Sequence, residues 1–222
     1  TTYDPGSQSI AQDTISYYSQ WLKNFAPSLK NTVPGVSNED HKNDIEIALL
    51  SVDYKTGKIL SMIGSFDYSV SQFNRAIHAM RQPGSLFKTI IYARALNTGS
   101  SWNDMVYISP LSLRGNYRPR SDAREYISET TLLRAFYKSI NAPTLSLGQS
   151  VGIDKLIIFA SRIGLSTKIK REIGSMLGSS ETTLYEMAKL YGMFANDGKL
   201  INPYVIERIT DVHGVDLFVQ PT

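Results

Sequence analysis

The chain has 222 residues, no cysteine and a formal net charge of +3 at pH 7. Hydrophobic residues make up 42% of it and charged residues 19%, a balance typical of a globular protein with a substantial core. The basic residues are scattered along the chain, which argues against nucleic acid as a partner. The lack of cysteine excludes disulfides and thiolate metal sites. No apolar run is long enough to cross a bilayer.

The N-terminal part is predicted to contain a long helix with an apolar face. Residues 9–29 have the helical pattern. The residues expected on its buried face are Ile10, Ile15, Tyr18, Trp21 and Leu22. We expect Tyr17, Tyr18 and Trp21 to belong to the core and not to a carbohydrate platform. A polar stretch with Pro34 and Gly35, residues 31–43, predicts a loop.

A β-hairpin is predicted next. The β-rich runs 45–53 and 59–63 flank the segment 54–58, whose composition is typical of a turn, so the two strands should pair antiparallel. Pro83 and Gly84 then interrupt the chain before a strongly apolar helical pattern. A buried helix is therefore expected to begin at Ser85 and to end at Gly99.

The following segments alternate loops and helices. Residues 109–124 predict a loop, and Thr130 or Thr131 can cap a helix that runs to about Ser139. Pro143 should end that helix or restart the chain in a new direction. A further helix is expected over residues 154–163, before Gly164.

The C-terminal part is predicted to hold one helix and two strands. Thr183 and Glu186 form a capping box for a helix that Asn196-Asp197-Gly198 should end. Strands are expected over 204–210 and from 215, with a turn at His213-Gly214. A hairpin, then helices, then strands indicates an α+β fold whose antiparallel sheet is assembled from both ends of the chain and flanked by helices.

The chemistry suggested by the sequence centres on Ser85-Leu86-Phe87-Lys88. Residues three apart on a helix share a face, so the Lys88 amine can approach the Ser85 hydroxyl. A serine is a weak nucleophile that needs a base, and a lysine becomes one when burial lowers its pKa. An arbitrary S-x-x-K is usually a helix cap beside a surface lysine. Here it stands between Pro-Gly and an apolar helix, and no other serine has a lysine three residues later.

The surrounding residues carry a resemblance to a known family. The block from Arg81 to Lys88, preceded by Phe73-Asn74-Arg75-Ala76, resembles the nucleophile region of class A (bifunctional) penicillin-binding proteins. Segments near both ends also match their transpeptidase domain. These are Thr1 to Asp4 with Gln8, Leu177-Gly178-Ser179, Thr183, Glu186-Met187-Ala188, Tyr191, Phe194-Ala195-Asn196 and Gly198. The resemblance implies the fold shared with serine β-lactamases, over one domain spanning residues 1–222.

Ser139-Ile140-Asn141 resembles the second motif of that family, S-x-N. The resemblance implies that Ser139 relays a proton between Lys88 and the leaving amine. It implies that Asn141 donates a hydrogen bond to the substrate carbonyl and steadies Lys88. Ser101-Trp102-Asn103 repeats the pattern too close behind Ser85, and we interpret it as a chance match.

The third family motif, K-T-G on a strand, is expected after S-x-N. Lys55-Thr56-Gly57 precedes the nucleophile and falls in the predicted hairpin turn, so we do not assign it to this motif. We expect the strand to lie beyond residue 222, so that the domain is incomplete at its C-terminus because it is truncated or nicked, with the missing C-terminal portion as a partner. The alternative is that the protein has lost its substrate strand. These residues alone would then lack one oxyanion donor and the groups that bind the substrate carboxylate.

The resemblance implies a serine-type D-alanyl-D-alanine transpeptidase that cross-links peptidoglycan stem peptides and is acylated by β-lactams. It also implies an extracytoplasmic location, with a glycosyltransferase domain and a membrane anchor upstream. No cofactor or metal is expected, since His41, His78 and His213 lack metal-ligand spacing. Arg118, Arg120 and Arg124 are expected in a solvated loop. The alternatives are a non-catalytic β-lactam sensor or scaffold with the same fold, and a D,D-carboxypeptidase.

Overall fold

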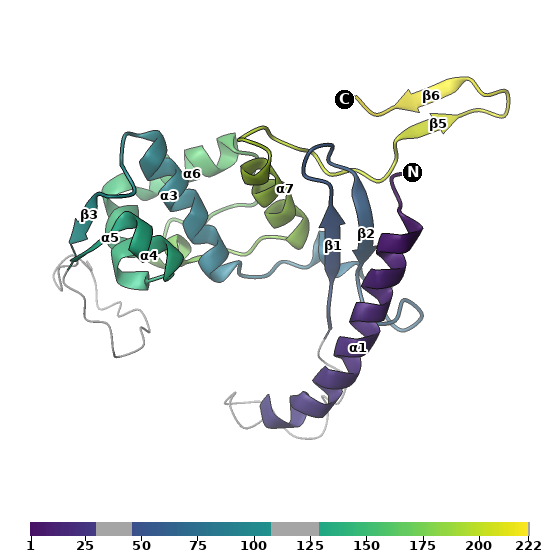
Figure 1. The fold of residues 1–222 in the computed structure, drawn as a ribbon, viewed down its shortest axis with the longest axis horizontal. Coiled ribbons are helices and arrows are strands. Elements are labelled where there is room, and N and C mark those ends of the chain that lie inside the picture. Colours follow the sequence, from purple (N-terminus) through teal and green to yellow (C-terminus); the bar gives the residue numbers. More distant parts are fainter. Residues whose placement is uncertain (30–45, 108–128, 222) are drawn as a thin grey trace. The chain divides into compact units, whose positions relative to one another are not determined.

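The structure is a computed structural model that describes residues 1–29, 46–107 and 129–221. The chain divides into two compact units (Figure 1). Unit 1 comprises Thr1–Ala79 with Thr183–Thr222, and unit 2 comprises Met80–Thr182. The predicted loop at 31–43, the predicted loop at 109–124 and its three arginines, and His41 lie outside the described residues.

Unit 1 is built around the predicted hairpin. Strands β1 (Leu49–Val52) and β2 (Ile59–Ile63) pair antiparallel, as the sequence predicted. Helix α1 (Pro5–Leu29) runs alongside β2 (Figure 1). Its buried face is made by Ala11 and Ile15, which pack with Ile63 into a small core. The Gln8 side chain fixes the helix to β2, since it accepts from Met62 N at 3.0 Å and donates to Met62 O at 3.3 Å.

The predicted buried face of α1 is wrong in most of its members. Ile15 is buried, but Ile10 is 68% exposed and Tyr17, Tyr18 and Trp21 are exposed as well. The three aromatic rings make edge-to-face contacts along the helix surface instead of entering the core. The hairpin is short, and small residues near the helix start, such as Ala11, already cover it. The side chain of Leu22 lies outside the described residues.

The rest of unit 1 is formed by segments that precede and follow unit 2 in the sequence. Helix α7 (Leu184–Ala195) contacts β1 and the short helix α2 (Arg75–His78). The N-cap bond of the predicted capping box is present, because Thr183 Oγ1 accepts from Glu186 N at 3.2 Å. Strands β5 (Arg208–Thr210) and β6 (Asp216–Val219) form an exposed hairpin.

The predicted α+β class is confirmed, but the single sheet is not. The described strands form three separate two-stranded antiparallel sheets. The segment after α7 pairs with the N-terminal hairpin at an isolated parallel bridge between Lys58 and Tyr204, and an ion pair joins Lys58 to Glu207. Tyr204 belongs to this bridge and not to β5, so the strand predicted from residue 204 begins four residues later than expected.

Unit 2 is a helical cluster that carries the candidate site. A 3-10 turn, η1 (Gly84–Phe87), leads directly into α3 (Lys88–Asn97), which packs against α4 (Leu132–Tyr137), α5 (Asn141–Val151) and α6 (Ile153–Arg162) (Figure 1). A short sheet of β3 (Met105–Tyr107) and β4 (Glu129–Thr131), and a second 3-10 turn, η2 (Ile173–Leu177), complete it. Its fully buried aliphatic and aromatic side chains include Phe87, Ile90, Ile91, Leu132, Leu145 and Leu156.

The predicted helix boundaries in unit 2 follow local chemistry. Thr131 caps α4, since its hydroxyl accepts from Arg134 N at 3.2 Å. Pro143 stands in the first turn of α5, where its missing N–H has no partner to lose, so the chain restarts in a new helix there. Gly99 and Gly164 follow the last turns of α3 and α6 with positive φ, as expected for helix C-termini.

Candidate active site

Ser85 and Lys88 lie on one turn at the start of a buried helix. Ser85 is in η1, and the Lys88 backbone N–H donates to the Ser85 carbonyl where η1 passes into α3. Ser85 is exposed, whereas Lys88 is only 2% exposed. The first N–H groups of such a helix have no partner within the helix and create positive potential near Ser85. Helical structure begins within one residue of the predicted start at Ser85, as a 3-10 turn that becomes α-helix from Lys88.

The backbone before Ser85 is held by a glycine contact that the sequence did not predict. Gly84 N donates to Gly178 O at 3.2 Å, and both glycines have positive φ, +56° and +81°. A Cβ at Gly178 would lie 2.1 Å from Gly84 O. Close by, Arg81 and Thr182 exchange two backbone hydrogen bonds of 2.9 Å. Gly178 thus fits only as glycine, and the segment that leads into Ser85 is fixed at Arg81 and at Gly84.

The Lys88 amine reaches the second motif. Lys88 Nζ donates to Ser139 O at 2.5 Å, to Ser139 Oγ at 3.0 Å and to Asn141 Oδ1 at 2.6 Å. All three acceptors are uncharged. An ammonium group has three N–H donors, and these three contacts would use them all.

Ser139 has an unusual backbone conformation. Its φ is +54°, a left-handed value that costs a non-glycine residue roughly 1 kcal/mol. It follows the last turn of α4, where Ser139 N donates to Phe136 O and Ile140 N donates to Ala135 O, both at 2.9 Å. The turn brings the carbonyl and the hydroxyl of Ser139 to the same amine. Asn141 then begins α5.

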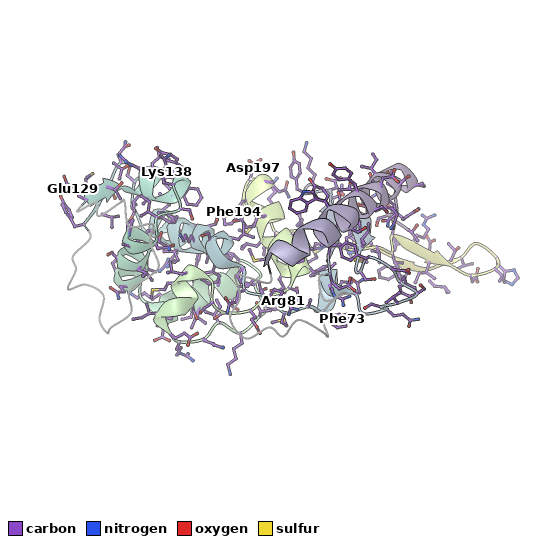
Figure 2. All side chains as sticks on the ribbon, turned by 90° about the horizontal axis from the view of Figure 1, so that it is seen from below. Phe73, Arg81, Glu129, Lys138, Phe194 and Asp197 are labelled. Carbon is purple, nitrogen blue, oxygen red and sulfur yellow. The ribbon has the colours of Figure 1, made fainter. Side chains whose placement is uncertain are left out.

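Burial perturbs Lys88 electrostatically. Removal of the amine from water disfavours its charged form and lowers the pKa of Lys88 to about 8. Among the described residues no carboxylate accepts a hydrogen bond from the amine, and none of them forms an ion pair with the ammonium. By contrast, Lys138, which immediately precedes Ser139, is exposed and lies on the outside of its unit with Nζ 5.5 Å from the Tyr137 ring centroid (Figure 2).

The four predicted site residues thus gather within unit 2. Lys88, Ser139 and Asn141 are joined by hydrogen bonds, and Ser85 is on the same turn as Lys88. Within the described residues the Ser85 hydroxyl makes no hydrogen bond to the Lys88 amine. Ser85 and Ser139 are exposed while Lys88 is covered, so a substrate can reach both hydroxyls beside a desolvated amine.

The two decoy motifs have structural explanations. Lys55-Thr56-Gly57 forms the turn between β1 and β2, where Asp53 Oδ1 accepts from Lys55 N and Asp53 Oδ2 from Thr56 Oγ1. Ser101-Trp102-Asn103 is a turn whose Trp102 ring packs 5.4 Å from that of Phe136. The Lys88 amine bonds to Ser139 and Asn141 and, among the described residues, not to either of these segments.

The described residues provide neither a metal-binding cluster nor a membrane-spanning helix. No group of three or more histidine, aspartate or glutamate side chains there is arranged to hold a metal ion. None of the helices in this part of the chain combines the length and the apolar character that a membrane span requires.

Comparison with known proteins identifies the family. Residues 47–222 match the model of the penicillin-binding protein transpeptidase domain. The chain belongs to this family. It is 37% identical over 177 residues to penicillin-binding protein 1A of Pseudomonas aeruginosa and 34% identical over 176 residues to penicillin-binding protein 1A of Rickettsia typhi. Each alignment covers 77% of this chain but 22% of the relative, so the chain spans about a fifth of the length of these relatives.

Solved structures agree on the fold. Penicillin-binding protein 1A from Haemophilus influenzae superposes with a TM-score of 0.71 at 34% identity, over 79% of this chain and 27% of that one. The penicillin-binding protein PonA1 from Mycobacterium tuberculosis gives a TM-score of 0.75 over 99% of this chain and 56% of that one. Its identity is 22%, and it supports the fold alone. The fold implied by the sequence resemblance is therefore confirmed.

Proposed function

We propose that this chain carries the acyl-transfer site of a peptidoglycan transpeptidase, with Ser85 as the nucleophile. The observation that supports this best is the setting of Lys88. Its amine is buried, has no carboxylate partner among the described residues, and bonds to both Ser139 and Asn141 within one turn of Ser85. Its pKa of about 8 makes the neutral amine available near neutral pH.

Loss of a proton changes how Lys88 can bond to its neighbours. A neutral amine has two N–H donors and one lone pair. The Ser139 carbonyl and the Asn141 Oδ1 atom can only accept, so they retain the two donors. The Ser139 hydroxyl can reverse and donate, or the lone pair can accept the proton of Ser85. Because one hydroxyl in the set can play either part, the amine can gain and lose a proton without leaving a buried group unpaired.

The first half-reaction is acylation. Ser85 Oγ attacks the carbonyl carbon between the two terminal D-alanines of a stem peptide, and its proton passes to Lys88 Nζ. The positive potential at the helix start stabilises the oxyanion that forms. When the C–N bond breaks, the proton passes from Lys88 through the Ser139 hydroxyl to the departing amine. D-alanine leaves, and an ester joins Ser85 to the peptide.

The second half-reaction reverses these roles. An amine of a neighbouring stem peptide attacks the ester carbonyl and gives up a proton towards Lys88. The C–O bond breaks, Ser85 Oγ regains its proton, and a peptide cross-link results. In a β-lactam the ring C–N bond breaks in the first step. The amine stays tethered in the product, so the ester persists.

The setting of the reaction follows from the same proposal. The substrates are peptidoglycan stem peptides, and β-lactams are inhibitors. The site works outside the cytoplasmic membrane, and the complete protein supplies an anchor and a glycosyltransferase domain. These features are inferred from family membership and the class A resemblance.

The test is turnover of a synthetic pentapeptide ending in D-alanyl-D-alanine by the full-length protein, with an amine acceptor present. Mass spectrometry should detect a cross-linked product and one D-alanine per cross-link, and both should vanish in Ser85→Ala. Release of D-alanine to water alone would mean a carboxypeptidase. Penicillin acylation without any peptide turnover would mean a sensor or scaffold.

A further inference from the structure

Helices α3 and α5 are joined by two hydrogen-bonded contacts, one turn apart. The first links Lys88 to Asn141 and belongs to the site above. The second links Tyr92, four residues after Lys88, to Thr144, three residues after Asn141. Their oxygens lie 3.0 Å apart. Residues three or four apart share a helix face, so the second contact lies directly beneath the first.

The donors in the second contact can be assigned. Thr144 Oγ1 lies 2.7 Å from Ile140 O, and a carbonyl oxygen can only accept. The single Thr144 proton is therefore used there, and the Tyr92 hydroxyl must donate to Thr144 Oγ1. Burial raises the pKa of Tyr92, which keeps this donor protonated. The bonds thus run in one direction from Tyr92 through Thr144 to Ile140, the central residue of Ser139-Ile140-Asn141.

Tyr92 also contacts the segment before Ser139. Its ring is 5.0 Å from that of Phe136 and stacks at 6.2 Å on Trp102. Phe136 is the residue whose carbonyl accepts from Ser139 N. Tyr92 is 1% exposed and Thr144 is 0% exposed, so neither group exchanges its partner for water. One side chain of α3 therefore supports the S-x-N segment on both sides, at the end of α4 and at the start of α5.

We infer that Tyr92 and Thr144 are positioning residues that hold Ser139 and Asn141 against the Lys88 amine. Bonding of a threonine to the carbonyl four residues earlier is common in helices and would by itself be structural. The additional Tyr92 donor comes from the helix that carries the base, so it links the place of Lys88 to that of its partners. The inference rests on the proposed function.

The test is the acylation of the full-length protein by a fluorescent penicillin, with saturation kinetics that separate the acylation rate constant from the dissociation constant of the initial complex. The informative variants are Thr144→Val, which removes both bonds, Thr144→Ser, which keeps both, Tyr92→Phe, and the double variant Tyr92→Phe/Thr144→Val. Tyr185→Phe is the matched control. It removes a tyrosine hydroxyl that donates to Pro203 O at 2.7 Å in unit 1.

The acylation rate constant should fall about tenfold in Thr144→Val and about fivefold in Tyr92→Phe, since misplaced catalytic groups lose rate steeply. The double variant should be no slower than Thr144→Val, because both changes break one chain of bonds. The dissociation constant of the initial complex should be unchanged in these variants, and Thr144→Ser should retain the parental acylation rate constant. Tyr185→Phe should lower the melting temperature without changing the rate constant.

An unchanged rate constant in folded Thr144→Val would overturn the inference, as would an equal loss of rate in Tyr185→Phe. If Thr144→Val does not fold, Tyr92→Phe decides, and a parental rate there overturns the inference. A parent protein that forms no ester at Ser85 would overturn the proposed function and the inference together. Acylation at Ser85 with no effect of these variants overturns the inference alone.

Discussion

The protonation state of Lys88 should control the rate of acylation at Ser85. A lysine with its usual pKa of 10.5 would be neutral in about 0.03% of molecules at pH 7, whereas a pKa of about 8 raises that share to about 10%. Burial therefore increases the active form roughly 300-fold at neutral pH. This gain is useful only if the neutral amine takes the Ser85 proton.

The assay is the second-order rate of acylation of the full-length protein by a fluorescent penicillin, measured from pH 5.5 to 9.5. The rate should rise about tenfold per pH unit up to pH 8 and then level off, because the neutral fraction saturates above the pKa. The matched control is Lys138→Met, which removes a lysine adjacent to Ser139 that is exposed, and its profile should match that of the parent. A rate independent of pH between 6 and 9 would refute the role of Lys88 as the base.

Three further predictions concern stability. Because folding lowers the Lys88 pKa, the unfolded chain keeps a proton between about pH 8 and 10.5 that the folded chain has lost. The free energy of unfolding of the parent, relative to that of Lys88→Met, should therefore rise with pH across this window. Chemical denaturation should show a rise of up to about 3 kcal/mol. Gly178→Ala should lower the free energy of unfolding by well over the roughly 1 kcal/mol expected for a positive φ alone, because its Cβ would collide with Gly84 O. Gly198→Ala is the control: Gly198 has the same φ in open space, so its loss of stability reports the backbone term by itself. Ser139→Gly should be about 1 kcal/mol more stable than Ser139→Ala, since glycine relieves the left-handed backbone, although both should lose acylation rate with the hydroxyl. Equal stability of Ser139→Gly and Ser139→Ala would contradict the strain at Ser139.

The elements that the sequence predicted well are those fixed by neighbouring residues. The hairpin of β1 and β2, the helix start at Ser85, and the caps at Thr131 and Thr183 each depend on a few consecutive residues. Turn residues, capping hydroxyls and helix-breaking prolines act locally, so their signals can be read without the fold.

The prediction for the buried face of α1 failed because the exposure of a side chain depends on which surfaces the rest of the chain covers. Tyr17 and Tyr18 are large and apolar enough for a core, yet among the described side chains of α1 it is Ala11 and Ile15 that pack against the small sheet. The predicted single sheet failed for a similar reason. Pairing of strands far apart in the chain depends on tertiary contacts that no local pattern records.

The sequence indicated the residues of the candidate site, but not the contacts that hold them in place. The resemblance pointed to Ser139 and Asn141, while their hydrogen bonds to Lys88 depend on the fold. The contact of Gly178 with Gly84 joins residues 94 positions apart, and only the glycine at each position hinted at it. The positive φ of Ser139 had no sequence signal, because serine is not a residue that favours this conformation.

The proposed function depends above all on Ser85 being the acylated nucleophile. The most direct measurement is the intact mass of the full-length protein after exposure to penicillin, followed by peptide mapping of the adduct. We expect one penicillin per chain, attached to the peptide that contains Ser85, and none on Ser85→Ala. An adduct on any other residue, or one that survives Ser85→Ala, would contradict this role of Ser85.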